Sequence, residues 1–286
     1  MHEIGNDRYR ALIAPGAGGA VMALEYQGRN IMRPAPSVEA IKADPRQAAC
    51  FPCVPWFGRL FGGLDFDGRH YDLAPTLPAC DPAHALHGEG WINSWTVTSG
   101  TQTSLKIRFD HAQEADKFPF SFRAEQSFSV GEAFEIDLSV TNTGDAPMPA
   151  GLGLHPFFPR HEKTRLRYSA DRLWTPEPAG GGSFVAPLPA GYDFSGGTPL
   201  AAAMDHTYIA WAGDTDIVNG RETINIQSNA SFLHIYAPAD ERFFCLEPVT
   251  HLPGKFGQEA LRPAATMSIF CRISISTTHT NMVNTE

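Results

Sequence analysis

The strongest constraint on the fold is a period of two, in which apolar and polar residues alternate along much of the chain. This pattern is typical of a β-strand with one face buried and the other toward solvent. Turn-forming clusters such as Gly131–Glu132, Thr143–Asp145 and Asn219–Gly220 separate the runs. The alternation predicts strands in these ranges: Thr103–Asp110, Ser121–Val130, Phe134–Asn142, Thr223–Gln227, Phe232–Ala237 and Met267–Ser276.

Proline and glycine leave little room for long helices. The 286 residues include 23 prolines and 26 glycines, and both residue types interrupt regular helix. Only Ser37–Ala49 is a plausible helix, with Ser37 as N-cap and Glu39 in the first turn, and Pro45 would interrupt it. No short repeat and no linker-like tract divides the chain. We therefore predict an all-β fold, a large antiparallel β-sandwich that forms a single domain over residues 1–286.

The charge balance excludes several classes of partner. The net charge is −9, and lysine and arginine occur singly rather than in runs. A nucleic-acid-binding protein needs a basic surface. An anionic membrane would repel a protein with an acidic surface. The first ten residues contain no apolar signal region, and no apolar run reaches the roughly 18 residues of a membrane span. We predict a cytoplasmic protein with no nucleic-acid or membrane partner, either a monomer or a homodimer.

The cysteines support a reducing compartment. Their number is odd and their spacing irregular, so we predict no disulfide: Cys50, Cys53, Cys80, Cys245 and Cys271. The pair Cys50 and Cys53 has the spacing of a redox or metal motif. Without a second such pair or a βαβ pattern, we interpret that spacing as incidental.

Four motifs and a weaker fifth stand out from the alternating background. They are Pro55–Gly63, His84–Trp91, Gly151–Phe158, Cys245–Pro253 and, more weakly, Met204–Trp211.

His155 and Glu247 each immediately precede a proline. A residue before proline is held extended, and the proline cannot donate to a strand pair, so we expect pairing to break just beyond both residues. A core histidine would fit the position of His155 equally well. A glutamate between Leu246 and Pro248, in contrast, is costly to bury without a function. The two residues are therefore candidates for an acid–base pair.

His87, Trp91 and Arg59 are candidates for binding. The glycines around His87 allow close backbone approach, and Trp91 offers a flat face on which a sugar ring can stack. A loop histidine beside a core tryptophan would explain the same residues. Arg59 lies in an apolar, glycine-rich segment, where its permanent charge needs either a carboxylate or the hydroxyl groups of a ligand.

Taken in order, LHGEGW (Leu86–Trp91), GLGLHPFF (Gly151–Phe158), MDHTY (Met204–Tyr208) and LEPVTH (Leu246–His251) resemble the signature motifs of the aldose 1-epimerase, or galactose mutarotase, family. GRLFGG followed by LDFDGRHYDL is similar to that family's N-terminal arginine motif. The resemblance covers roughly Arg59 to Pro253 and implies an antiparallel sandwich of the supersandwich type.

The resemblance also implies roles for individual residues. Glu247 matches the catalytic base of the family and His155 its catalytic acid, while His87, Asp205 and Arg59 match its substrate-binding residues. The family commonly has asparagine directly before the arginine, where this chain has Gly58.

A carboxylate and an imidazole suit the implied reaction. Mutarotation opens the ring of a free aldose when a base takes the C1-hydroxyl proton and an acid protonates the ring oxygen. We expect Glu247 and His155 to face each other across a cleft, about a sugar ring apart. The reaction needs no cofactor, and the chain has no dinucleotide-binding, P-loop or nucleophile-elbow motif.

Three alternatives stay open. A metal enzyme could cluster the histidines of the motifs: His84, His87, His155, His206 and His251. A non-catalytic carbohydrate-binding protein could keep Trp91 and Arg59 on the same fold. A mutarotase for phosphorylated hexoses would need a cationic pocket, such as Arg59 with Arg69 or Arg160.

Overall fold

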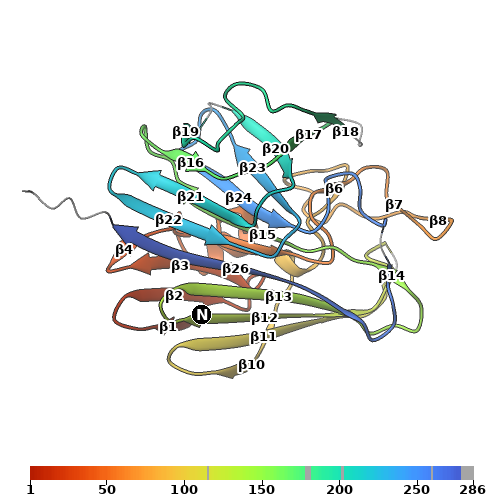
Figure 1. The fold of residues 1–286 in the computed structure, drawn as a ribbon. Helices are drawn as coiled ribbons and strands as arrows, with labels where there is room; N and C mark the ends of the chain where they lie inside the picture. Colours follow the sequence, from red (N-terminus) through yellow and green to blue (C-terminus); the bar gives the residue numbers. More distant parts are fainter. Residues whose placement is uncertain (115, 178–181, 201–202, 259, 278–286) are drawn as a thin grey trace, which may run out of the picture.

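Strands dominate the computed structural model (Figure 1). Helix among the described residues is limited to α1 (Val38–Ala43) and two 3₁₀ turns, η1 (Pro45–Gln47) and η2 (Gly90–Ile92). The predicted all-β class is therefore confirmed. The structure describes residues 1–277 apart from 115, 178–181, 201–202 and 259.

The larger sheet has 11 antiparallel strands in the order β1-β2-β3-β5-β15-β24-β23-β20-β17-β18, with β4 paired to β3. Its central strands come from distant parts of the sequence, so motifs far apart along the chain become neighbours. The strands are β1 (His2–Gly5), β2 (Tyr9–Ala14), β3 (Ala20–Tyr26), β4 (Arg29–Asn30), β5 (Cys50–Cys53), β15 (Gly153–Pro159), β17 (Arg172–Pro176), β18 (Gly182–Val185), β20 (Met204–Ile209), β23 (Phe232–Ala237) and β24 (Phe243–Val249).

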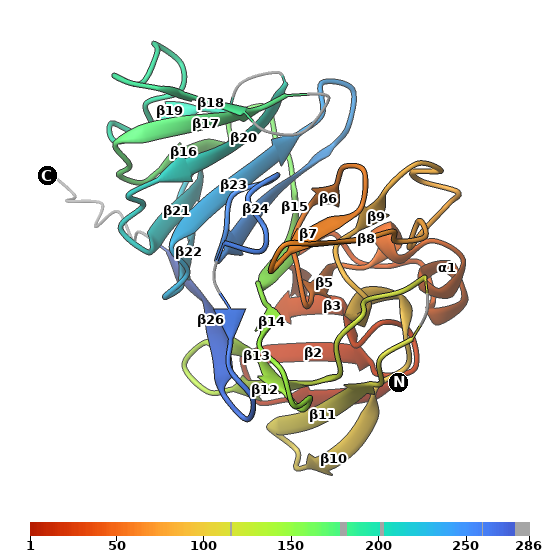
Figure 2. The same ribbon diagram turned by 90° about the vertical axis from the view of Figure 1, so that its right-hand side faces the viewer.

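The second sheet has nine strands in the order β10-β11-β12-β13-β26-β22-β21-β16-β19. It packs against the larger sheet as the other layer of the sandwich (Figures 1 and 2). Its strands are β10 (Thr96–Gly100), β11 (Ser104–His111), β12 (Phe122–Val130), β13 (Phe134–Asn142), β16 (Arg165–Arg167), β19 (Thr198–Pro199), β21 (Asp214–Asn219), β22 (Glu222–Gln227) and β26 (Thr266–Thr277).

Three short two-stranded pairs complete the described strands. They are β6 (Arg59–Leu60) with β9 (Ala85–Leu86), β7 (Leu64–Phe66) with β8 (Arg69–Tyr71), and β14 (Met148–Pro149) with β25 (Ala260–Leu261). In Figure 2 the loops that carry β6 to β9 lie beside β15 and β5, and His87, which follows β9, packs against Phe51 of β5 and His155 of β15. These loops therefore stand at the rim of the larger sheet.

The alternating runs form the predicted strands because their apolar side chains share one buried face. In β12 and β13 the buried positions alternate with partly exposed ones along nine residues each, and Gly131–Glu132 makes the turn between them. Ile136 and Phe128 stand opposite each other and are both buried. Each such side chain contributes about 1.5–3 kcal/mol when fully buried.

The helix starts as predicted and ends earlier. The Oγ of Ser37 accepts a hydrogen bond from the backbone N–H of Ala40 at 3.1 Å, which caps α1. The predicted range of Ser37–Ala49 is too long, because α1 ends at Ala43. Pro45 has no N–H to continue the helix, and it instead begins the 3₁₀ turn η1.

The two faces of the larger sheet bury different clusters. Leu154 and Leu246 point into the core shared with the second sheet, whereas Phe157 and Cys245 belong to a separate cluster on the opposite face, called here the outer face. No helix in the described part of the chain is long and apolar enough to cross a bilayer. All five cysteines are free thiols.

Candidate active site

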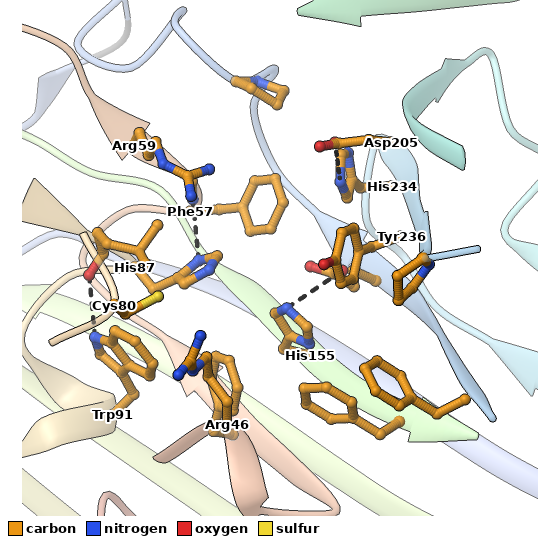
Figure 3. Close-up of a pocket in the computed structure, with 18 of the residues that line it drawn as sticks. Arg46, Phe57, Arg59, Cys80, His87, Trp91, His155, Asp205, His234 and Tyr236 are labelled. Carbon is orange, nitrogen blue, oxygen red and sulfur yellow. Dashed lines mark hydrogen bonds and ion pairs between the residues drawn. The ribbon is translucent and has the colours of Figure 1, made fainter. Parts of the chain in front are cut away.

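A cavity of about 710 Å³ opens on the outer face of the larger sheet. Its volume lies within the range of about 300–1,000 Å³ that is typical of small-molecule sites. Side chains from β5, β15, β20, β23 and β24 and from the rim loops line it (Figure 3). All six residues predicted from the sequence are among them: Arg59, His87, Trp91, His155, Asp205 and Glu247.

The floor of the cavity is a row of side chains that crosses adjacent strands. Strand register places Thr207 opposite His234, His234 opposite Glu247, and His155 opposite Phe51. Between β15 and β24, Gly153 pairs with Val249 and Phe157 pairs with Cys245, so His155 lies opposite Glu247 as well. Residues that face each other across antiparallel strands project from the same face, so the row brings three motifs together.

The prolines act on the sheet differently from the prediction. Strands β15 and β24 continue through Pro156 and Pro248, so neither strand ends there. Instead, the pairing between the two strands is interrupted at the level of His155 and Glu247 and resumes on both sides. A proline in each strand explains the gap, because neither can donate a backbone hydrogen bond across it.

His155 and Glu247 are close neighbours rather than a sugar ring apart. The Nε2 atom of His155 lies 3.4 Å from Oε1 of Glu247 (Figure 3). The predicted separation is therefore wrong, because the two side chains stand side by side on adjacent strands. This spacing suits two oxygens bonded to one carbon, such as the C1 hydroxyl and the ring oxygen of an aldose.

Burial gives this pair its electrostatic character. The side chain of Glu247 is 1% exposed, and neither of its oxygens has a hydrogen-bond partner; Nδ1 of His155 also lacks one. Burial, together with the charge of Asp205, raises the pKa of Glu247 well above its usual value. Burial, with the nearby His87 and His234, lowers the pKa of His155. Buried polar atoms without partners are costly, which indicates that a ligand completes them.

The backbone fixes the tautomer of His87. Its Nδ1 accepts a hydrogen bond from the N–H of Gly58 at 3.1 Å, so the ring proton is on Nε2. Burial and the charge of Arg59 lower the pKa of His87 to about 3, so the ring is neutral. Gly88 is required beside it, because a Cβ there would lie 2.1 Å from the carbonyl oxygen of Val54. His87 is thus a fixed hydrogen-bond donor.

Trp91 does not offer the predicted stacking face. The residue is 1% exposed, and its ring packs against Phe51 and edge-on against His87. Its Nε1 donates to the carbonyl oxygens of Leu86 and Gly88. Trp91 therefore supports the loop that carries His87 from below.

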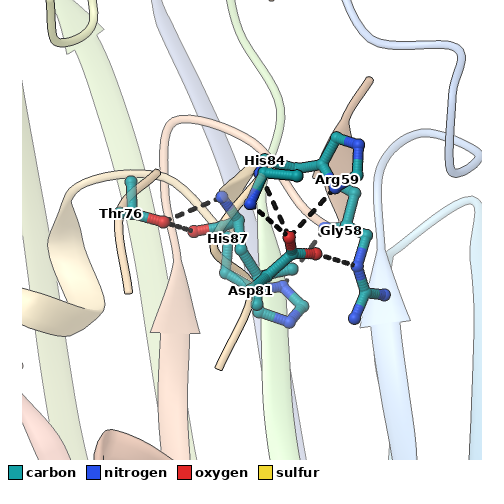
Figure 4. Close-up of polar contacts among 8 residues, drawn as sticks. Gly58, Arg59, Thr76, Asp81, His84 and His87 are labelled. Carbon is teal, nitrogen blue, oxygen red and sulfur yellow. Dashed lines mark hydrogen bonds and ion pairs between the residues drawn. The ribbon is translucent and has the colours of Figure 1, made fainter. Parts of the chain in front are cut away.

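Arg59 is held at the rim by a carboxylate. Its Nε donates to Asp81 at 2.6 Å, and Asp81 also contacts His84 and accepts from the backbone of that loop (Figure 4). Burial alone would raise the pKa of Asp81, but the hydrogen bond from Arg59 and the other contacts lower it to about 2. The side chain of Arg59 remains 45% exposed, so the guanidinium N–H groups that do not bind Asp81 can reach a ligand.

Asp205 forms a second histidine–carboxylate pair. Its Oδ1 lies 3.3 Å from Nε2 of His234, and the other ring nitrogen of His234 lies 2.8 Å from the hydroxyl of Thr207. The side chain of Asp205 is 61% exposed and lines the cavity. It is therefore placed to accept hydrogen bonds from a polar ligand.

The rim loop is fastened from beneath by His251. Its Nε2 accepts from the N–H of Phe57 at 3.0 Å, and its Nδ1 donates to the carbonyl oxygen of Leu252. Both ring nitrogens are thus occupied, and burial lowers the pKa of His251 to about 4. The ring of Phe57 packs against His87 and His234, which leaves the cavity wall apolar between the polar groups.

Comparisons with known proteins agree with this arrangement. The aldose 1-epimerase family model matches residues 1–269. The chain belongs to the aldose 1-epimerase family. It is 32% identical over 221 residues to the uncharacterized protein YphB of Escherichia coli K12, over 72% of this chain and 74% of that protein.

Solved structures of similar proteins share the fold. A putative aldose 1-epimerase from Escherichia coli K12 superposes with a TM-score of 0.86 at 26% identity, over 97% of this chain and 99% of the other. A galactose mutarotase-like protein from Clostridium acetobutylicum gives a TM-score of 0.83 at 19% identity, over 96% and 95% of the two chains. The large antiparallel β-sandwich predicted from the sequence is therefore the aldose 1-epimerase fold.

The histidine cluster of the metal hypothesis does not form in this aldose 1-epimerase family member. Alternation on β20 puts His206 on the opposite face from Asp205, and both ring nitrogens of His251 are engaged by the backbone. Within the described part of the chain, a different set of potential ligands comes together: His155, Cys245 and Glu247, with ligand atoms within 4.8 Å of one another.

Sequence reasoning missed His234 and Asp81. His234 stands in the alternating run Phe232–Ala237, where the pattern puts it on the face opposite the apolar positions, and only the structure shows that it is buried. Asp81 lies in a rim loop outside the motifs, 22 residues from its partner Arg59. Register and loop closure bring these groups to the site, and neither is visible in a linear pattern.

Proposed function

We propose that this protein is an aldose 1-epimerase, an isomerase that interconverts the α and β anomers of a free aldose. The observation that carries the proposal is the buried pair His155 and Glu247, 3.4 Å apart on the cavity floor with unpartnered carboxylate oxygens. A non-catalytic sugar-binding protein would gain nothing from burying such a pair, because burial of ionisable groups without partners costs stability.

The pair fits both oxygens on C1. The pair reacts in the form that carries its single proton on His155. Glu247 removes the proton of the C1 hydroxyl, the bond between C1 and the ring oxygen breaks with its electrons on that oxygen, and His155 gives its proton to it. The open aldehyde rotates about its C1–C2 bond and closes with the two roles exchanged. Each positioned acid or base typically contributes about 10² to 10⁴ in rate.

The remaining residues bind the substrate in this proposal. Nε2–H of His87 and the free guanidinium N–H groups of Arg59 donate to sugar oxygens, and Asp205 accepts from a hydroxyl. Trp91 and His234 position their neighbours rather than stack on the ring. No step requires a cofactor. The five free thiols support the prediction of a reducing, cytoplasmic setting.

A neutral aldose fits the cavity better than a hexose phosphate. Arg69 and Arg160 are not among the residues that line the cavity; Arg33 and Arg46 join Arg59 there. Four carboxylates line the same cavity and balance these arginines: Asp44, Asp205, Glu241 and Glu247. Arg46 is already paired with Asp44. A phosphate would thus meet no net positive charge.

Polarimetry of freshly dissolved aldoses tests the proposal. We expect the protein to speed the approach to anomeric equilibrium for at least one free aldose and not for a hexose 6-phosphate. Sugar binding by calorimetry without any rate acceleration across the panel would instead identify a carbohydrate-binding protein. Acceleration confined to the phosphate would identify a hexose-phosphate mutarotase.

A further inference from the structure

A third chemically capable side chain stands beside the proposed acid–base pair and has no role in it. Cys245 lies two residues before Glu247 on β24, so both side chains project from the outer face. Its thiol is 0% exposed and forms no disulfide. Proton transfer between the oxygens of a sugar has no use for a thiol.

The three side chains form a mixed nitrogen, sulfur and oxygen set. A ring nitrogen of His155, the Sγ of Cys245 and a carboxylate oxygen of Glu247 all lie within 4.8 Å of one another. Ligands of one zinc ion stand about 2.0–2.3 Å from it, so small side-chain rotations would be needed to close the set around an ion. Such a rotation of Glu247 would break no hydrogen bond, because neither of its carboxylate oxygens has a hydrogen-bond partner.

The set has the composition of an open zinc site. Three protein ligands with a fourth position toward a cavity are typical of zinc bound at catalytic sites, and thiolate with imidazole favours zinc or cobalt over magnesium or calcium. His155 and Glu247 line the cavity, which provides the entry path and the open position.

We infer that His155, Cys245 and Glu247 form a binding site for a divalent cation that prefers thiolate ligands, such as Zn²⁺. Because the site includes the acid and the base assigned under the proposed function, the bound ion excludes the aldose from the cavity floor and inhibits mutarotation reversibly. Cys245 loses its proton to solvent when the metal–sulfur bond forms.

Cobalt spectroscopy tests the site without any sugar. Metal-free protein is titrated with Co²⁺, and we expect a thiolate-to-cobalt charge-transfer band that Zn²⁺ abolishes by displacement. The band should persist in Cys80→Ser, a matched control, because Cys80 lines the cavity outside the set. The band should be absent from Cys245→Ser and from Cys245→Ala. If only one of these two variants folds, that variant is sufficient for the test. Absence of the band from the wild type, or its persistence in a folded Cys245 variant, overturns the inference.

Inhibition provides the functional readout. We expect Zn²⁺ to slow mutarotation competitively with the aldose and a chelator to restore the rate. In Cys245→Ser the inhibition constant should rise at least about 10-fold, the smaller end of the loss seen when support for a metal ligand is removed. The rate without Zn²⁺ should be unchanged, since the thiol has no part in the reaction. A cobalt band without mutarotation would overturn the proposed function and leave the metal site standing.

Discussion

Two histidine–carboxylate pairs lie next to each other in the cavity, and they have almost the same spacing. Nε2 of His155 is 3.4 Å from Glu247, and Nε2 of His234 is 3.3 Å from Asp205. Their surroundings differ: the side chain of Glu247 is 1% exposed, and that of Asp205 is 61% exposed. The cavity thus contains the same two chemical groups twice, once in a buried environment and once in an exposed one.

The environments shift the two carboxylates in opposite directions. Burial raises the pKa of Glu247, and the negative charge of Asp205 adds to the effect. Burial, the largest single cause, would also raise the pKa of Asp205, but the hydrogen bond and charge of His234, together with the charges of His206 and Arg59, outweigh burial and lower the pKa. Asp205 therefore stays ionised and suits binding, whereas Glu247 and His155 share a proton and suit transfer.

The largest difference between the pairs should come from removing one carboxylate at a time. Glu247→Gln keeps the shape of the side chain and removes its proton exchange, so we expect kcat to fall by about 10² to 10⁴ with little change in KM. Anomer equilibration followed by polarimetry gives both constants. A Glu247→Gln enzyme that works at the wild-type rate would exclude Glu247 as a catalytic group.

The pH dependence should report the buried pair. With the pKa of Glu247 raised and that of His155 lowered, the pair holds one proton between the two limbs of the profile. A second proton on the acid side, or loss of the single proton on the alkaline side, should each reduce kcat by about tenfold per pH unit beyond the limb. Rates measured across pH should be bell-shaped, with limbs that belong to the pair. A flat profile would contradict shared proton transfer.

Asp205→Asn should reduce activity less than Glu247→Gln does, and the loss should appear mainly in KM rather than in kcat. Loss of a charged hydrogen-bond acceptor costs about 1.5–3 kcal/mol, so we expect kcat/KM to fall about 10- to 100-fold, mostly through KM. Removing this negative charge should also lower the proton affinity of the buried pair and move the pH profile to lower pH. A large loss confined to kcat would instead assign Asp205 to the chemical step.

The contrast also shows which parts of the molecule a sequence can predict. Period-two runs predicted β13 and β23 to the residue, because in each strand every second side chain is apolar and lies on one buried face. For Arg59 and His155 the local pattern fitted a structural role as well as a functional one, and the family-like motifs favoured the functional role. Both residues line the cavity. The prolines that follow His155 and Glu247 predicted an interruption of strand pairing but not its form, because the form depends on which strand lies alongside.

What could not be predicted depends on contacts across strands and loops. His234 reaches Asp205 through the register of β20 with β23, and the 3.4 Å spacing of His155 and Glu247 follows from that of β15 with β24. Trp91 was expected to be open and is covered, since packing rather than residue type decides which face of an aromatic ring remains free.

The smallest expected effect concerns the support of Arg59. Asp81→Asn weakens the contact that orients the guanidinium, and because Arg59 is 45% exposed, solvent screens much of the interaction. We expect KM to rise about 2- to 5-fold with kcat nearly unchanged, in keeping with a loss of up to about 1 kcal/mol.

Asp65→Asn is the matched control, because Asp65 pairs with His70 on the exposed β7–β8 hairpin. Thermal unfolding of both variants separates loop destabilisation from positioning. An unchanged KM in folded Asp81→Asn would mean that Arg59 is oriented by the loop backbone alone, and a fall in kcat would place Arg59 in the chemical step together with the buried pair.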